Sequence, residues 1–377
     1  MKNMISRRHF IKMAGLAAVS WGALFAGAGC TSGTVSATSS SLATDEFIDG
    51  LTCMIDLHLH LDGALSLKSA RDLASLQGID IPESDEEVLD LIRVSDGCDD
   101  LNEFLEKFDF PLSLMQTPEG LRRATSNLLD ELHEQGVAYS EIRWAPQLHC
   151  QQGMTQEQAI QQVIAGVEDS GQDANLILCL MRGEDTHEAN KETVRLAKQY
   201  LGNRVVAVDL AGAEALYPTS DYADDFALAR ELGIPITIHA GEAAGADSVK
   251  CALDMGATRI GHGVRCVEDA DLVKRLADEG VALTVCPTSN ICTAIYEDYN
   301  DCVIMELRDA GVTVCVCTDD PGVENTTLKE EYKHLVDAFS LTRADVKAFL
   351  ENAARASYAS DSEKERLLEM IDQQISD

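Results

Sequence analysis

The chain contains 377 residues, of which 45% are hydrophobic and 25% charged, and its formal net charge at pH 7 is −34. A surface of that sign repels nucleic acids and anionic lipids, so the composition excludes proteins that bind either one through a broad basic surface. It is compatible with a large folded domain that binds a neutral or cationic small molecule.

The first residues are predicted to be a targeting segment rather than part of the fold. Arg7 and Arg8 lie in a pattern typical of twin-arginine export signals, and residues 13–28 carry no charge. Small residues then precede Cys30, as they do at the cleavage site of a bacterial lipoprotein. We predict a signal peptide over residues 1–29 and a lipid on Cys30 that anchors the protein outside the cytoplasm. Gly27 stands where such signals usually have a larger apolar residue, and an uncleaved N-terminal helix is the alternative.

Residues 30–50 are predicted to form a flexible tether. The segment 31–44 is rich in Ser, Thr, Ala and Gly and shows no apolar periodicity. Such compositions behave as flexible chains because they cannot bury enough apolar surface to order themselves. One folded domain is therefore expected over residues 51–377, with its first ordered residue near Asp45 or Leu51.

The cysteines are predicted to be mostly buried and reduced. Twelve are present, and an odd number remains once Cys30 is set aside. Disulfide frameworks are typical of small secreted domains, whereas this chain is large. Several cysteines lie inside apolar runs, where a thiol behaves as a small hydrophobic group. A zinc site built on Cys315 and Cys317 is the weaker alternative, because no second pair lies at a ligand spacing.

Short apolar runs alternate with helical patterns through the rest of the chain. The expected strands are 53–57, 139–144, 175–181, 205–210, 234–239, 259–261, 282–286 and 313–317. The expected helices between them include 118–135, 155–168, 191–200, 222–231, 269–278 and 303–309, with 343–351 and 362–372 closing the fold. Eight strand–helix units predict an α/β fold of the (β/α)₈ barrel type. The long piece 66–117 is expected to hold additional helices that cover the mouth of the barrel.

Histidines and acids fall at the carboxyl ends of these predicted strands. His58 and His60 follow the first strand, and residues two apart on extended chain point to the same side. His239 ends the fifth strand, His262 follows the sixth and Asp319 follows the eighth. Active sites of such barrels are built at this end of the strands. Imidazoles with one carboxylate suit Zn²⁺ or a similar borderline ion, so the pattern predicts a catalytic metal site.

Three further side chains could perform the acid–base steps at such a site. Glu242 lies three residues after His239, and a carboxyl group held protonated there could donate to a ring nitrogen. His262 could orient the attacking hydroxide. Asp320 could accept or donate a hydrogen bond to the substrate. The alternatives are a solvated loop acid for Glu242 and a turn residue before Pro321 for Asp320.

In these motifs the sequence resembles the adenosine deaminase family of metal-dependent amidohydrolases. The matching pieces are DLHLHLDGAL (56–65), VDLAG (208–212), HAGE (239–242), RIGHG (259–263), CPTSN (286–290) and TDDP (318–321). In order and position they cover nearly all of residues 51–377. The resemblance implies hydrolytic deamination of adenosine to inosine and ammonia.

The resemblance also implies residue roles. One zinc ion per chain would be bound by His58, His60, His239 and Asp319. The catalytic residues would be Glu242 as proton donor to purine N1, His262 as partner of the hydroxide, and Asp319. The substrate-binding residues would be His60, Asp62 at the ribose 5′-hydroxyl, Gly212 at purine N3, Asp320 at purine N7, and Phe104 and Phe108 on an apolar gate helix.

The choice of substrate depends mainly on Asp62. A carboxylate at the ribose end accepts a hydrogen bond from a 5′-hydroxyl and repels a 5′-phosphate, and relatives acting on free adenine tend to carry Glu there. We therefore predict adenosine and 2′-deoxyadenosine, with adenine or a 5′-modified adenine nucleoside as the alternative. A third reading is a barrel that hydrolyses an amide or ester. Another class is a non-catalytic exported lipoprotein that binds zinc or nucleosides.

Overall fold

The computed structural model describes residues 41–94 and 104–376, and the ordered fold begins before Leu51. Leu42 pairs with Thr342, and α1 (Asp45–Asp49) follows with Thr44 as its N-cap and Ile48 fully buried. The predicted tether is therefore too long at its carboxyl end, because a capped turn with one apolar anchor suffices to dock it. The predicted signal peptide and Cys30 lie outside the described residues.

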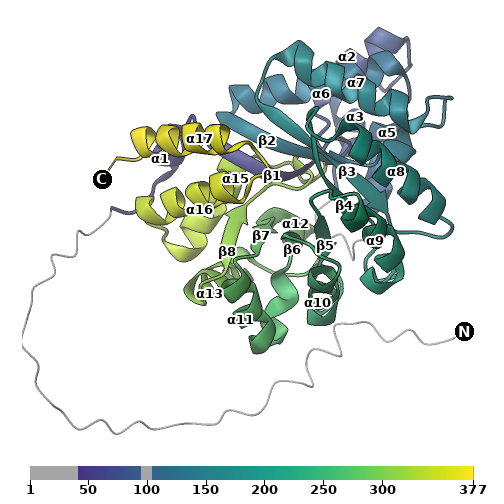
Figure 1. Cartoon of the computed structure of the whole chain (residues 1–377). Helices are drawn as coiled ribbons and strands as arrows, with labels where there is room; N and C mark the ends of the chain where they lie inside the picture. Colours follow the sequence, from purple (N-terminus) through teal and green to yellow (C-terminus); the bar gives the residue numbers. More distant parts are fainter. Residues whose placement is uncertain (1–40, 95–103, 377) are drawn as a thin grey trace, which may run out of the picture. The chain divides into compact units, whose positions relative to one another are not determined.

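Eight parallel strands form the centre of the fold (Figure 1). They are β1 (Met54–His60), β2 (Val137–Trp144), β3 (Ala174–Met181), β4 (Val205–Ala211), β5 (Thr237–Ala240), β6 (Arg259–His262), β7 (Ala282–Val285) and β8 (Thr313–Val316). Two four-stranded sheets run in chain order, β1 to β4 and β5 to β8. Parallel bridges join them at both seams, Val208 with Ile236 and Leu59 with Asp319. The predicted (β/α)₈ barrel is confirmed.

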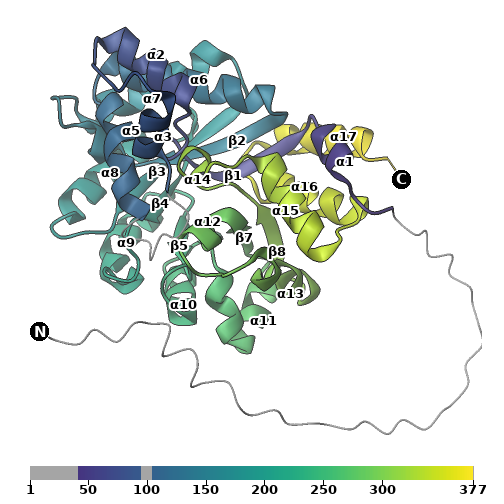
Figure 2. The ribbon, with the colours of Figure 1, turned by 180° about the vertical axis from the view of Figure 1, so that it is seen from behind.

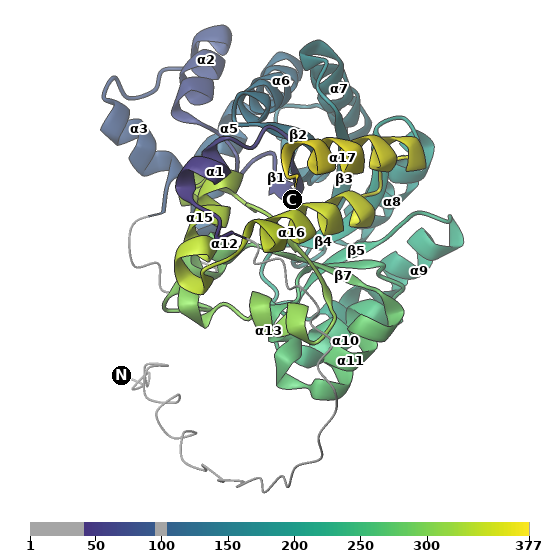
Figure 3. The same cartoon turned by 90° about the vertical axis from the view of Figure 1, so that its left-hand side faces the viewer.

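Helices alternate with the strands and surround them, as Figures 1 and 2 show from opposite sides. The α-helices after α1 are α2 (Leu67–Gln77), α3 (Asp85–Ile92), α5 (Asp109–Leu114), α6 (Pro118–Glu134), α7 (Gln156–Ser170), α8 (His187–Tyr200), α9 (Ala223–Glu231), α10 (Ala246–Asp254), α11 (Ala270–Glu279), α12 (Pro287–Cys292), α13 (Ile304–Asp309), α14 (Pro321–Glu324), α15 (Leu328–Phe339), α16 (Arg343–Ala356) and α17 (Asp361–Gln374). The 3₁₀ turns are η3 (Glu106–Phe108), η4 (Pro146–His149), η5 (Thr219–Tyr222), η6 (Val264–Glu268) and η7 (Tyr299–Asp301). Figure 3 shows α16 and α17 side by side at the end of the chain.

Local signals explain why these helices form where they do. In α6, Thr117 caps the first turn and Pro118 occupies the first helical position, where its missing N–H has no intrahelical partner to lose. Leu121, Leu128 and Leu132 then recur on the buried face of the helix. This spacing is the pattern from which the helix was predicted.

Two strand boundaries differ from the prediction in a way that matters for the site. His60 pairs with Arg143 on β2, and His262 pairs with Ala240 on β5, so these histidines belong to the strands and do not follow them. Pairing with the neighbouring strand holds His60 in β1 and His262 in β6, although histidine itself has only a weak preference for strands. β5, by contrast, starts later than predicted, at Thr237. Pro235 has no N–H to donate to a ladder.

The segment between β1 and β2 holds the extra helices that were predicted for it: α2, α3, η3 and α5. Phe104, Phe108 and Leu112 from this segment line the cavity described below. Of the ten cysteines in the described ranges, seven are buried, and none forms a disulfide with another described residue. Within these same ranges, no helix has both the length and the apolar character needed to cross a membrane.

Candidate active site

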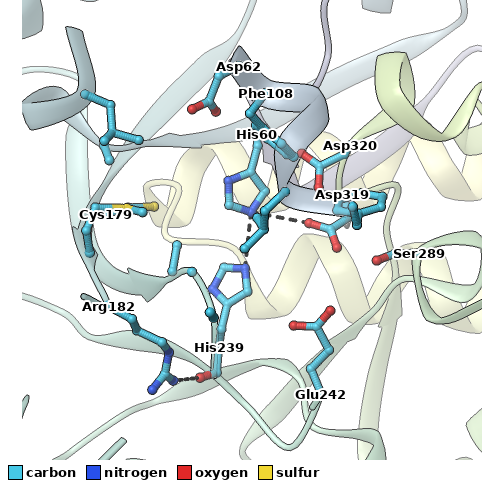
Figure 4. Close-up of a pocket in the computed structure, with 18 of the residues that line it drawn as sticks. His60, Asp62, Phe108, Cys179, Arg182, His239, Glu242, Ser289, Asp319 and Asp320 are labelled. Carbon is cyan, nitrogen blue, oxygen red and sulfur yellow. Dashed lines mark hydrogen bonds and ion pairs between the residues drawn. The ribbon is translucent and has the colours of Figure 1, made fainter. Parts of the chain in front are cut away.

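A cavity of about 280 Å³ opens at the carboxyl ends of the strands, and the predicted site residues gather in it (Figure 4). Its walls include His60, Asp62, Phe104, Phe108, Gly212, His239, Glu242, His262, Asp319 and Asp320. His58 lies directly beneath them and is fully buried. Every predicted site residue is therefore at this one place, contributed by β1, β4, β5, β6, β8 and the segment covering the mouth.

Four donor atoms converge at the floor of the cavity. The Nε2 atom of His239 lies 3.0 Å from that of His58 and 3.2 Å from that of His60. Asp319 Oδ1 lies 3.2 Å from His58 Nε2 and 3.3 Å from His60 Nε2. Ligands about 2.0 Å from a tetrahedral ion are roughly 3.3 Å from one another. The spacing of the four predicted donors matches that arrangement.

The hydrogen bonds behind the rings show that the facing nitrogens carry lone pairs. Thr284 donates its hydroxyl to the Ile260 carbonyl, so it accepts from His58 Nδ1–H at 2.8 Å. His239 Nδ1 lies 2.9 Å from an oxygen of the Asp209 carboxylate, whose charge favours hydrogen on that nitrogen. A neutral imidazole with hydrogen on Nδ1 has only a lone pair at Nε2. Two lone pairs 3.0 Å apart repel each other unless a cation lies between them, so the donor set fits a bound metal ion.

Asp209 is itself held by a buried ion pair. One of its oxygens lies 2.6 Å from Arg143 Nη1, and both side chains are fully buried. Burial alone would raise the pKa of Asp209, but His239 and Arg143 overcome it and hold that pKa well below its usual range. The carboxylate therefore stays ionised and keeps the His239 ring in the ligand orientation.

The backbone is strained at two of the site residues. His262 has φ of 56° and Asp319 has φ of 73°, a left-handed region that non-glycine residues seldom adopt. Such strain persists only where the surrounding structure holds it, and it clusters at active sites. Here Asp319 is held through both of its backbone polar groups, since its N–H donates to the His58 carbonyl and its own carbonyl accepts from His60.

Glu242 is a buried acid in an environment that favours its protonated form. Its side chain lies in the cavity wall, and Oε2 is 3.7 Å from His262 Nε2. Burial, with added repulsion from Asp319 and Glu214, raises the pKa of Glu242 well above its usual range. A protonated carboxyl group that faces a cavity can donate a proton to a substrate.

His262 is neutral at physiological pH. Burial lowers its pKa to about 4, against an opposing effect of Asp319. Its Nε2 lies 3.4 Å from Asp319 Oδ2, the oxygen that does not face His58 and His60. The ring therefore stands beside the four donors and next to Glu242, where it can hydrogen-bond an attacking water molecule.

Asp320 is placed by a glycine. A Cβ atom at Gly63 would stand 1.7 Å from Asp320 Oδ1, so only glycine lets the β1 loop approach this carboxyl group. Burial, together with the charge of Asp319, raises the pKa of Asp320 well above its usual range. Its Oδ1 has no hydrogen-bond partner among the described residues. The protonated form of Asp320, which this shift favours, can donate a hydrogen bond into the cavity.

The remaining predicted residues line the upper part of the cavity. Asp62 is buried, and its Oδ1 has no partner in the part of the chain that the structure describes. Gly212 follows β4 with φ of 105°, a conformation that glycine adopts without penalty. The rings of Phe104 and Phe108, which both line the cavity, lie 5.9 Å apart.

Several residues that position the site were not predicted. Asp209 lies in a segment that was recognised, but its role behind His239 was not assigned. Thr284 supports His58, and Arg182 donates to the His239 carbonyl at 2.7 Å. A polar residue that interrupts an apolar strand near its carboxyl end is the signal that could have revealed Asp209 and Thr284.

Comparisons with known proteins agree with this geometry. A family model described as adenosine deaminase matches residues 54–374. The adenosine deaminase of Haemophilus ducreyi is 44% identical over 329 residues, which are 85% of this chain and 96% of that protein. The solved structure of an adenine deaminase from Arthrobacter aurescens has a TM-score of 0.78 at 30% identity, covering 86% of this chain and 99% of that one. An N6-methyl-AMP deaminase from Arabidopsis thaliana has a TM-score of 0.75 at 26% identity, covering 88% and 98%.

The barrel and its cluster of imidazoles and carboxylates define an enzyme of the amidohydrolase kind, with a site able to hold a metal ion. The chain belongs to the adenosine deaminase family. This membership confirms the prediction that the protein is an enzyme. It leaves the non-catalytic lipoprotein and the amide- or ester-hydrolysing barrel without support.

Proposed function

We propose that this protein is a zinc-dependent adenosine deaminase that acts outside the cytoplasm. It would convert adenosine and 2′-deoxyadenosine, with water, to the 6-oxo nucleoside and ammonia. The observation that carries this proposal is the buried carboxyl group of Glu242 beside four converging metal donors, in a cavity of nucleoside size. The 44% identity to an adenosine deaminase over most of both chains supports the same substrate.

The residues of the chain would divide the reaction among them. The Gly212 N–H would bind purine N3 and the neutral Asp320 would donate to N7, which together orient the ring. Glu242 would donate its proton to N1 as the oxygen of water adds to C6. Of the two water protons, one would leave with the amino group as ammonia, and the other would return to the Glu242 carboxylate as the C6 carbonyl forms. His262 would orient the attacking water. The phenyl rings of Phe104 and Phe108 would exclude bulk water from the cavity.

His58, His60, His239 and Asp319 would bind the metal. Three imidazoles and one carboxylate are a donor set that suits Zn²⁺. When bound, the ion would lower the pKa of a water molecule enough for attack at neutral pH.

The substrate assignment depends on the ribose end of the cavity. Asp62 is buried there with a free acceptor oxygen. A 5′-hydroxyl would satisfy that oxygen, a 5′-phosphate would be repelled by it, and a free adenine would leave it unpaired. Adenine and 5′-modified adenine nucleosides are the alternative substrates, and the similarity to an adenine deaminase structure is why they must be tested.

The wild-type protein is expected to favour adenosine over adenine and AMP by at least about 100-fold in kcat/KM. The reason is that, of the three, only adenosine has a 5′-hydroxyl that can donate a hydrogen bond to Asp62.

In the Asp62→Asn variant, kcat/KM for adenosine should fall about 10-fold, because one charge-assisted hydrogen bond is lost. The matched control is 5′-deoxyadenosine, which lacks the hydroxyl and should respond less than about 3-fold. Ultraviolet absorbance follows each reaction. Faster turnover of adenine or AMP, or an equal loss with both nucleosides, would contradict the assignment.

Export and anchoring are proposed from the segment around Arg7, Arg8 and Cys30. In a bacterium with a twin-arginine pathway, the Arg7→Lys/Arg8→Lys variant is expected to keep more than about 90% of the protein in the cytoplasm, because that pathway reads the arginine pair. Cys30→Ser should be exported but recovered without membrane, since no lipid can be attached. Cell fractionation with immunoblotting measures both. Membrane recovery of Cys30→Ser equal to wild type would rule out the lipid anchor.

A further inference from the structure

Glu214 is a buried carboxylate on the loop that follows β4, two residues beyond Gly212. Both of its oxygens accept hydrogen bonds from the loop that carries Glu242, and one of them also accepts from α10, which follows that loop. Oε1 accepts from the Gly241 N–H at 2.9 Å and from the Ser248 hydroxyl. Oε2 accepts from the N–H of Glu242 at 3.1 Å and of Ala244 at 2.8 Å. We propose that Glu214 is a positioning residue that sets the place of the proton donor Glu242 relative to the bound purine.

The Glu242 loop has few other anchors for its N–H groups. The N–H of Gly241, Glu242 and Ala244 all end on this one carboxylate. The carbonyl groups of the loop are bound from elsewhere. Arg182 donates to the His239 carbonyl, and Arg265 donates to the carbonyls of Gly241 and Ala243. Removal of the Glu214 charge would therefore weaken the hydrogen bonds of the loop N–H groups, while the loop carbonyl groups keep theirs.

The carboxylate is ionised and fully paired. Burial alone would raise the pKa of Glu214, but the Arg182 charge and the hydrogen bond from Ser248 overcome it and lower that pKa. A glutamine has the same shape but offers one acceptor oxygen and an amide that would face two N–H donors. The Glu214→Gln variant would therefore disrupt the hydrogen bonds to the loop without leaving a cavity.

The position of Glu214 in the chain explains why it would matter for the reaction. This step rests on the proposed function, in which Gly212 binds purine N3 and Glu242 protonates N1. These two nitrogens flank C2 on one edge of the ring. Because Glu214 is two residues after Gly212, one short stretch of backbone both contacts the substrate at N3 and holds the loop that must reach N1. The spacing between the two contacts would then be set by Glu214.

A double-mutant cycle tests this role. In the purified, zinc-loaded full chain, Glu214→Gln is expected to lower kcat for adenosine about 10- to 100-fold, with KM changed less than about 3-fold. In the Glu242→Gln background the same substitution should cost less than about 3-fold, because the group that Glu214 positions is already disabled. Bound zinc per chain should match wild type, and the protein should remain folded at the assay temperature. Equal losses in both backgrounds would overturn the proposal, as would a loss of activity that parallels a loss of zinc from the folded protein.

Two further variants keep the test decisive. Ser248→Ala removes one hydrogen-bond donor to the same carboxylate and should lower kcat by a smaller factor, about 2- to 5-fold. This loss should also disappear in the Glu242→Gln background. If Glu214→Gln does not fold, the Ser248→Ala cycle decides the question. Glu279→Gln is the matched control, since Glu279 is an exposed acid at the end of α11 that pairs with Arg275, and it should change kcat less than about 2-fold. If the wild-type protein turns over another purine instead of adenosine, only the proposed substrate fails, and the cycle is run with that purine.

Discussion

The Glu242→Gln variant is expected to lose about 1000-fold in kcat for adenosine, with little change in KM. Glu242 lies in the cavity wall with its Oε2 atom 3.7 Å from His262 Nε2, and its pKa is raised well above the usual range. General acid catalysis by a placed carboxyl group contributes roughly 100- to 10,000-fold, and the amide of glutamine cannot transfer a proton. Steady-state kinetics by ultraviolet absorbance measures the loss. A variant that retains more than about one tenth of the wild-type kcat would exclude Glu242 as the proton donor.

The same variant should also change the pH profile. The pKa of Glu242 is raised by burial and by neighbouring negative charge, and the protonated form is the active one. Activity of the wild type should therefore persist through neutral pH and fall as the pH rises through that elevated pKa. The residual activity of Glu242→Gln should lack this alkaline decline. Glu106→Gln, at an exposed acid on η3, serves as the control and should keep the wild-type profile.

Removal of the metal is expected to reduce activity to less than about 1% of the starting value, and added Zn²⁺ should restore it. The reason is that no described side chain in the cavity is placed to activate water in place of a metal ion, whereas His58, His60, His239 and Asp319 converge on one point. Dialysis against a chelator, elemental analysis and the deaminase assay measure this together. Full activity in protein shown to be free of metal would contradict the assigned site.

Two variants separate the ligands from their supports. His239→Ala should not recover activity with added Zn²⁺, because a ligand is missing. Asp209→Asn should recover at higher Zn²⁺ concentration, with metal affinity about 10- to 100-fold weaker, because all four ligands remain while the support of the His239 ring and the ion pair with Arg143 are weakened. Competition with a chelator of known affinity measures the difference. Equal behaviour of the two variants would show that Asp209 does more than orient the ring.

The barrel and the location of its site could be predicted because both depend on patterns that are local in the chain. Apolar runs of strand length alternate with helical periodicity, and this order specifies parallel strands whose carboxyl ends meet at one edge. His58, His60, His239, His262 and Asp319 each lie at such an end. Their convergence follows from the topology alone, before any distance is known.

What surrounds those residues was decided only by the tertiary structure. Thr284 supports the ring of His58 across 226 positions of sequence, and Arg143 holds Asp209 across 66. Glu214 reaches the backbone of Glu242 from another strand's loop, and burial keeps Glu242 protonated. None of these follows from spacing, because each depends on which strands are neighbours, in what register, and how completely water is excluded. The sequence by itself determined the fold and the identity of the site residues, whereas their ring orientations and protonation states arise from contacts and burial that exist only once the barrel has closed.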